Sequence, residues 1–68
     1  MGNRLKERRL HRGLTQAQLA TAAGVNVRLV QHYEQGTKDI NKAAAVTVHL
    51  LARALECRVE DLLEMSNI

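Results

Sequence analysis

Apolar residues recur along this chain at the three- and four-residue spacing of helices, and glycines or helix-capping residues separate the groups. The first group spans 3–13, where Asn3 is suited to cap a helix and Gly13 to end it. In the second group Thr15 and Gln18 have the spacing of a capping box, in which each side chain satisfies a backbone N–H of the other residue. The pattern therefore predicts two helices before residue 24.

The rest of the pattern predicts three further helices. Gly24 favours a tight turn, and the next helix covers 26–35, with Asn26 as its cap and Gly36 at its end. A fourth helix is expected to begin at Asn41, and its apolar stripe consists of Ala45, Val48, Leu51, Ala52 and Leu55. A short closing helix is expected from the positions of Val59, Leu62, Leu63 and Met65. These segments predict an all-α, compact five-helix domain.

Composition supports helices and a single domain. The chain has 68 residues, no proline and one aromatic residue, and it is rich in strong helix formers. A chain of this length is expected to form one domain over 1–68, with its core over about 3–64. Cys57 is the single cysteine, which excludes a disulfide framework and favours a role as a small buried hydrophobe. Because no apolar run reaches the roughly 18 residues of a membrane span and no secretory signal is evident, a cytoplasmic protein is expected.

Charge is distributed unevenly along the chain. The net charge is +3, but residues 1–55 hold nine Lys and Arg against three acidic residues, whereas residues 56–68 hold one Arg against four acidic residues. This asymmetry predicts a basic body that meets a polyanion and an acidic end that is turned elsewhere. Ordinary surface charge that keeps the protein soluble is the alternative explanation.

The segment 26–35 has two chemically different sides. At about 100° per residue, Val30 and Tyr33 fall on the side that faces the core. The opposite side carries no negative charge and consists of Arg28, Gln31, His32 and Gln35. Arg and Gln are the side chains suited to the edges of guanine and adenine. This side is therefore a candidate surface for DNA, with an ordinary solvated helix face as the alternative.

Glu34 is the acidic residue of this segment, and it falls close to the buried side. A carboxylate that is partly removed from water requires a cation. Arg9, on the inward side of the first predicted helix, is the natural partner. We therefore predict an Arg9–Glu34 ion pair that joins the first helix to the third; the alternative is that each side chain is solvated separately.

The stretch "LTQAQLATAAGVNVRLVQHYEQG" resembles the helix-turn-helix of the Cro/repressor (XRE-like) DNA-binding domains. The segment "LLARALECRVEDLLE" is similar to the last two helices of the same family, so the likeness covers roughly residues 3–64. It implies a fold of the lambda-repressor-like type. Two departures stand out. Glu56 and Cys57 replace the usual glycine and hydrophobe, and the loop before the fourth helix lacks the frequent proline.

The resemblance also implies roles for particular residues. Base edges would be read by Val27, Arg28, Gln31 and His32. Phosphates would be bound by Gln16, Asn26, Gln35 and Lys38. Arg9 and Glu34 match a pair that joins helices in some members of the family.

These residues lead to an expected function: sequence-specific binding of double-stranded DNA by a transcriptional regulator, such as a repressor of prokaryotic or phage type. It is expected to act as a dimer, with helix 26–35 in the major groove. The dimer contact is expected in the acidic, Leu-rich segment 59–68, alone or together with the fourth predicted helix. The alternative for that segment is that its leucines merely close the monomer core. A second hypothesis is a protein-interaction module on the same fold, such as an antitoxin or a coactivator-like adaptor.

Catalysis and cofactor binding have no support in the sequence. Ser66 is the single serine, and the histidines have no evident partner at the spacing of a catalytic triad. His49 and Cys57 have no further ligands to complete a zinc site. We therefore expect no enzyme activity, no metal, no cofactor and no small-molecule ligand.

Overall fold

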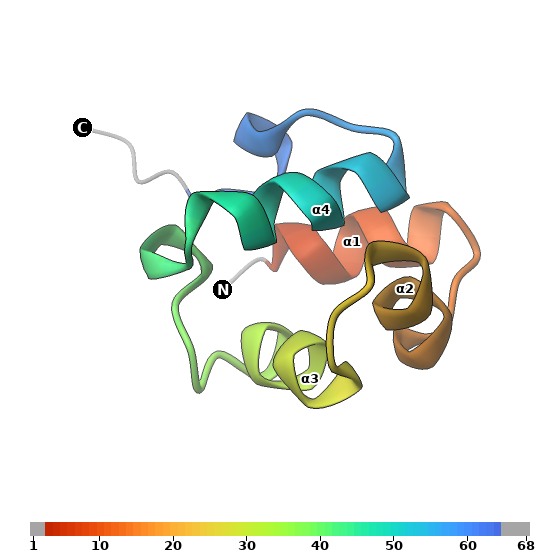
Figure 1. Cartoon of the computed structure of the whole chain (residues 1–68), viewed down its shortest axis with the longest axis horizontal. Helices are drawn as coiled ribbons and strands as arrows, with labels where there is room; N and C mark the ends of the chain where they lie inside the picture. Colours follow the sequence, from red (N-terminus) through yellow and green to blue (C-terminus); the bar gives the residue numbers. More distant parts are fainter. Residues whose placement is uncertain (1–2, 65–68) are drawn as a thin grey trace.

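A computed structural model describes residues 3–64, and these form four α-helices and two short 3₁₀ turns. The α-helices are α1 (Arg4–His11), α2 (Gln16–Ala23), α3 (Val27–Gln35) and α4 (Ala45–Leu55), and the 3₁₀ turns are η1 (Ile40–Lys42) and η2 (Val59–Asp61). Figure 1 shows α4 in the upper part of the molecule and α3 at the bottom, and α2 packs against both of them. The all-α prediction holds for the described residues, but they contain four α-helices rather than five.

The predicted closing helix is the single turn η2. The Asp61 carboxylate accepts the backbone N–H of Arg58 at 3.0 Å, and the Leu62 N–H donates to the Val59 carbonyl at 2.9 Å. Leu62 follows this turn and is completely buried, and the segment does not continue as an α-helix. Met65, which the sequence assigned to the same helix, lies outside the described residues.

The predicted start of the fourth helix at Asn41 is wrong. The Asp39 side chain accepts the Asn41 N–H at 2.9 Å, which begins η1 instead. The Asn41 side chain donates to the carbonyl of Glu64 at 2.7 Å and accepts its N–H at 2.8 Å. Asn and Asp side chains often capture nearby backbone groups in this way and so compete with a helix. Ala43 is extended, and α4 begins at Ala45.

The predicted caps are present at the first three helices. The Asn3 side chain accepts the N–H of Lys6 at 2.9 Å, and Thr15 forms both bonds of a capping box with Gln18. The Asn26 side chain accepts the N–H of Arg28 at 2.8 Å. Each cap satisfies a backbone donor that the first helical turn leaves without a partner.

The core is built from apolar residues of all four helices, of η1 and of the position that follows η2. Its buried members are Leu5, Leu19, Ala20, Ala23, Val30, Tyr33, Ile40, Val48, Leu51, Ala52, Leu55 and Leu62. Val30 and Tyr33 face this core, as the helical periodicity of 26–35 predicted. Cys57 packs against the same cluster and is half-buried. None of the helices within residues 3–64 combines the length and the apolar character needed to cross a membrane.

Candidate nucleic-acid interface

The turn between α2 and α3 sets the angle at which α3 is presented. Gly24 has a φ of 73°, a left-handed conformation that favours glycine. The N–H of Val25 donates to the carbonyl of Ala20 at 3.0 Å, which closes the end of α2. Ala20 is buried and small, so it permits the close packing of α2 against α3. The result is two helices joined by a short turn, with α3 at the edge of the molecule (Figure 1).

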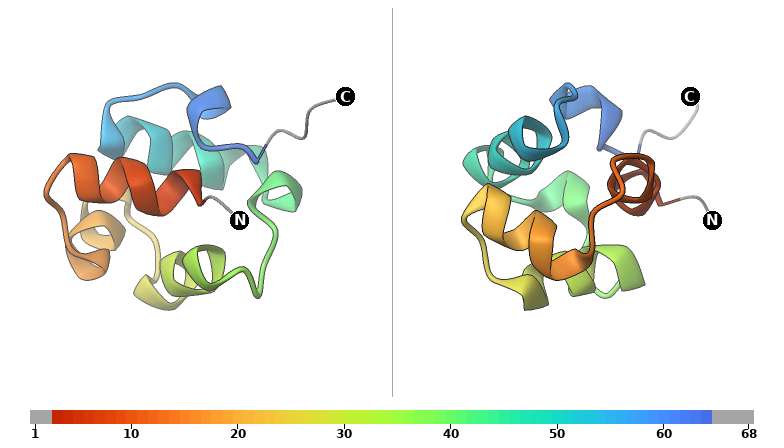
Figure 2. Two further views of the ribbon diagram at one scale, coloured as in Figure 1. Left: turned by 180° about the vertical axis from the view of Figure 1, so that it is seen from behind. Right: turned by 90° about the vertical axis from the view of Figure 1, so that its right-hand side faces the viewer.

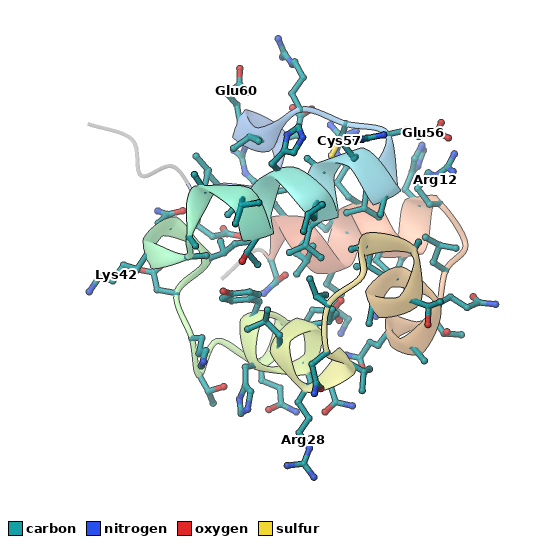
Figure 3. All side chains as sticks on the ribbon, in the orientation of Figure 1. Arg12, Arg28, Lys42, Glu56, Cys57 and Glu60 are labelled. Atoms are coloured by element: carbon teal, nitrogen blue, oxygen red, sulfur yellow. The ribbon has the colours of Figure 1, made fainter. Side chains whose placement is uncertain are left out.

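The predicted base-reading residues of α3 differ in how far they are exposed. Arg28 and His32 are exposed, and Arg28 extends away from the body of the protein in Figure 3. Gln31 is half-buried, and Val27 is half-buried against the core. Arg28 and His32 therefore offer the most side-chain surface to a ligand, while Val27 and Gln31 offer less than the sequence alone indicated.

Arg9 and Glu34 lie together in the part-buried space between α1 and α3. The Nε of Arg9 donates to Oε2 of Glu34 at 2.7 Å, and Nη2 donates to Oε1 at 2.9 Å. Their side chains are only 10% and 3% exposed. The hydrogen bonds to Glu34 raise the pKa of Arg9, outweighing the opposing effect of burial. The carboxylate of α3 is thus neutralised and withdrawn from the outer side of the helix.

Gln16, a predicted phosphate-binding residue, is joined to the same pair. Its side-chain N–H donates to Oε1 of Glu34 at 3.0 Å. An amide group has two N–H donors, so this bond orients Gln16 and leaves a second donor. Gln16 is the first residue of α2, where the helix dipole and the N–H groups of the first turn favour an anion. Glu34 therefore also positions the Gln16 side chain at the N-terminus of α2, where the partial positive charge of the helix favours a phosphate.

The other predicted phosphate-binding residues surround α3. Asn26 precedes the helix and uses its side-chain oxygen as the cap, which leaves the amide N–H groups as donors. Gln35 lies at the C-terminal end of α3, and Lys38 follows in the loop; both are exposed. Lys38 forms no ion pair within residues 3–64. These three residues are placed along the length of α3, at both ends of its exposed side.

Sequence reasoning missed two contacts at the C-terminal end of α3. The amide of Asn3 donates to the carbonyls of Tyr33 and Glu34 at 2.9 and 3.1 Å, so the cap of α1 also holds α3. Thr37 lies against His32, with Oγ1 2.8 Å from Nδ1 of the imidazole. The signal for Thr37 was in the sequence, because a glycine that ends a helix in the left-handed conformation folds the following residue back over the last turn.

Two acidic residues of the segment 56–61 form ion pairs with the basic residues of α1 and its C-cap. Arg8 lies 3.6 Å from Asp61, and Arg12 lies 3.2 Å from Glu56. Figure 3 shows Arg12 and Glu56 close to each other, and the views in Figures 1 and 2 place η2 at the end of the molecule away from α3. Arg8 and Arg12 belong to the basic body that the charge distribution predicted to meet a polyanion, and both are already paired with carboxylates.

The described residues hold no group of three or more His, Cys, Asp or Glu side chains arranged to bind a metal ion. Burial raises the pKa of the Cys57 thiol, and a nearby Arg8 opposes this effect only in part. His49 is exposed on α4.

Two short helices, a glycine turn and an outward polar side on the second helix together define a helix-turn-helix module. The model of the helix-turn-helix domain family matches residues 1–65. The chain therefore belongs to this family, in agreement with its likeness to Cro/repressor-type domains, and the membership indicates DNA binding. Domains of this family are typically not enzymes. No curated protein and no solved structure matches the chain.

Proposed function

We propose that this protein is a sequence-specific regulator that binds double-stranded DNA and places α3 in the major groove. Support comes from the family, from the exposed polar side of α3 and from the position of η2, which carries Glu60 and Asp61, at the end of the molecule away from α3 (Figure 2). The groove of B-DNA is wide enough to admit one α-helix.

The observation that carries the proposal is the charge of α3. The structure describes this helix in full, and its one carboxylate, Glu34, is 3% exposed and bound to Arg9. The exposed side consequently presents Arg28 and neutral hydrogen-bonding groups to the solvent. A helix that served only solubility would ordinarily mix both signs of charge on its outer side. An outer side without carboxylates is instead matched to the phosphates and base edges of DNA.

In the proposed complex Arg28 is the principal reader of a base. Its guanidinium is suited to donate two hydrogen bonds to O6 and N7 of a guanine. His32, one turn further along α3, reads a second base. Gln31 and Val27 contribute less because each is half-buried, Gln31 by hydrogen bonding and Val27 by apolar contact with a thymine methyl group.

Phosphate contacts fix the position of the helix in the groove without selecting a sequence. Gln16 is proposed to bind one phosphate at the start of α2, where Glu34 holds its amide. Asn26 and Gln35 are proposed to bind phosphates at the two ends of α3. Lys38 adds the attraction of a full positive charge, which makes its contribution dependent on salt.

The protein is proposed to act as a dimer on a site with two related halves. One nine-residue recognition helix reads few base pairs, and two copies separated by about 34 Å reach successive major grooves. The contact is proposed to lie in the segment 59–68. Leu62 belongs to the monomer core, so in the described part of this segment Val59 and Leu63 are the half-buried apolar residues left for a partner.

Titration with DNA at several salt concentrations tests this function. We expect the affinity for a preferred duplex to exceed that for a random duplex and to fall steeply between about 50 and 200 mM salt. Arg28→Ala should weaken binding to the preferred duplex by about 5- to 150-fold, the range for one bidentate base contact. Arg53→Ala is the matched control, because Arg53 is exposed on α4, away from α3.

Two results would contradict this function. If the chain binds preferred and random duplexes equally, or if Arg28→Ala and Arg53→Ala weaken binding to the same extent, the proposed reading by α3 is wrong. A protein-interaction module on the same fold then becomes the better explanation.

A further inference from the structure

His32 and Thr37 are held against each other at the end of α3. Gly36 has a φ of 82°, which turns the chain back so that the N–H of Thr37 donates to the carbonyl of His32 at 3.0 Å. This closure places the Thr37 side chain beside the ring, with Oγ1 2.8 Å from Nδ1. Both residues are exposed, so the contact is not a consequence of core packing.

The neighbouring hydrogen bonds indicate which of two acceptors receives the hydroxyl hydrogen of Thr37. Its two possible acceptors are Nδ1 of His32 at 2.8 Å and the carbonyl of His32 at 3.2 Å. That carbonyl already receives backbone N–H groups from Gly36, Thr37 and Lys38, whereas a carbonyl oxygen has two lone pairs. Donation to the carbonyl would leave Oγ1 to accept a hydrogen from Nδ1. The crowding of the carbonyl and the shorter distance to the ring nitrogen favour the other arrangement, in which the hydroxyl donates to Nδ1.

This bond determines the chemistry of the outer nitrogen of the ring. A neutral imidazole has one N–H, and when Nδ1 accepts a hydrogen bond the hydrogen is on Nε2. The imidazolium form also carries a hydrogen on Nε2. The nitrogen that His32 presents to its surroundings is therefore a hydrogen-bond donor in both forms.

We propose that Thr37 is a positioning residue that fixes the ring of His32 and makes Nε2 a donor, so that His32 selects a base with an acceptor in the major groove. Such bases offer purine N7, guanine O6 or thymine O4, whereas the amino group of cytosine requires an acceptor. This inference rests on the proposed function of α3 as the reading helix. It adds a residue outside α3 to the determinants of sequence preference.

The free protein provides the first test, without any DNA. A long-range ¹H–¹⁵N spectrum of the imidazole nitrogens reports which nitrogen carries the hydrogen, and His32→Gln identifies the signals of His32. We expect Nε2 protonated and Nδ1 unprotonated in the unmodified chain and in Thr37→Ser. Thr37→Val, which has the same shape without the hydroxyl, should show a mixture of both forms. A hydrogen on Nδ1 in the neutral form of the unmodified chain would overturn the assignment.

DNA binding provides the second test, as a double-mutant cycle. Thr37→Val should weaken binding to the preferred duplex by about 3- to 10-fold, the range for one hydrogen bond, and should relax preference at the base that His32 reads. Thr37→Ser should restore both. In the background of His32→Ala, Thr37→Val should cause no further loss, because Thr37 acts through the ring.

Other outcomes reject the proposal in distinguishable ways. An equal loss from Thr37→Val with and without His32 shows that Thr37 contacts DNA itself, and an unchanged affinity shows that the ring needs no positioning. If the unmodified chain binds all DNA sequences equally, the proposed function is wrong, and so is the role of His32 as a reader of bases. The imidazole spectrum would still show whether Thr37 donates a hydrogen bond to His32. Melting temperatures of the three Thr37 forms verify that each variant is folded.

Discussion

The Glu34 carboxylate stabilises the fold through Arg9 and also orients Gln16, a residue of the proposed DNA-binding surface. It accepts hydrogen bonds from Arg9 and from Gln16, which come from two other segments of the chain. The need for a cation was predictable from the helical position of Glu34, because a half-buried carboxylate is costly without one. The bond from Gln16 was not predictable in the same way, since its formation depends on how closely α2 approaches α3.

Replacing Glu34 by Ala should destabilise the fold by about 2–4 kcal/mol, because Arg9 would keep its charge in a part-buried site with the Leu14 carbonyl as acceptor but without a carboxylate. For a domain of this size the melting temperature should fall by more than about 10 °C, measured by circular dichroism. Glu7→Ala, at an exposed position of α1, is the control and should change stability by less than about 0.5 kcal/mol. An equal melting temperature for Glu34→Ala and Glu7→Ala would contradict the role assigned to the pair.

A substitution at Glu56 should raise the stability of the fold. It ends α4 with a φ of 56°, a conformation that costs a non-glycine residue about 1 kcal/mol. Its ion pair with Arg12 is exposed and contributes less than that. Glu56→Gly should therefore raise the melting temperature by a few degrees, whereas Glu56→Ala, which keeps the strained conformation and loses the pair, should lower it. If the glycine variant melts below the alanine variant, the explanation fails.

At the scale of elements, caps and apolar spacing predicted the first three helices closely, because the signals that begin and end them are local. Thr15 with Gln18 and the glycines at 24 and 36 are such signals. The fourth helix was placed too early because the side chain of Asn41 binds residue 64, a long-range contact that local patterns do not contain. The closing turn was taken for a helix because the spacing of Val59 and Leu62 fits both structures.

The N-terminus of α2 and the loop after α3 should contribute to binding in different ways. Gln16 is neutral, so Gln16→Ala should weaken binding to preferred and random duplexes alike and leave the salt dependence unchanged. Lys38 is charged, so Lys38→Ala should reduce the slope of log K against log salt by about 1. Titrations of both variants at several salt concentrations distinguish these effects. A reduced slope for Gln16→Ala, or an unchanged slope for Lys38→Ala, would contradict the proposed contacts.

At the scale of the whole molecule, the fold places acidic residues from the end of the chain away from the basic residue Arg28 on α3. The sequence showed only that acidic and basic residues are unevenly distributed along the chain. The segment 56–61 lies beside α1, at the end of the molecule away from α3, as Figures 1 and 2 show. The composition predicted this separation in outline. It did not reveal that Arg8 and Arg12 are paired with Asp61 and Glu56, because those pairs depend on the path of the chain after α4. Thr37 beside His32 is a different case, because its position follows from Gly36, the local signal that ends α3.

Asp61 should make the stability of the domain depend on pH. The backbone N–H of Arg58, followed by the charge of Arg8 among others, holds the pKa of Asp61 below its ordinary value of 3.8. A carboxyl group with a lowered folded-state pKa stabilises the fold above its unfolded pKa, and this contribution is lost as pH falls through the folded-state value. The difference in melting temperature between the unmodified chain and Asp61→Asn should therefore shrink as pH falls from about 6 to below that value. A difference that stays constant over this range would contradict the assignment.

The most direct test of the central claim is an unbiased selection of bound sequences from random DNA duplexes. The account predicts that the unmodified chain enriches one motif with two related halves about one helical turn apart. Arg28→Ala should lose the preference at one position in each half, while Arg53→Ala should enrich the original motif. Failure of the unmodified chain to enrich any motif, or enrichment of the same motif by Arg28→Ala, would contradict the claim that α3 reads DNA.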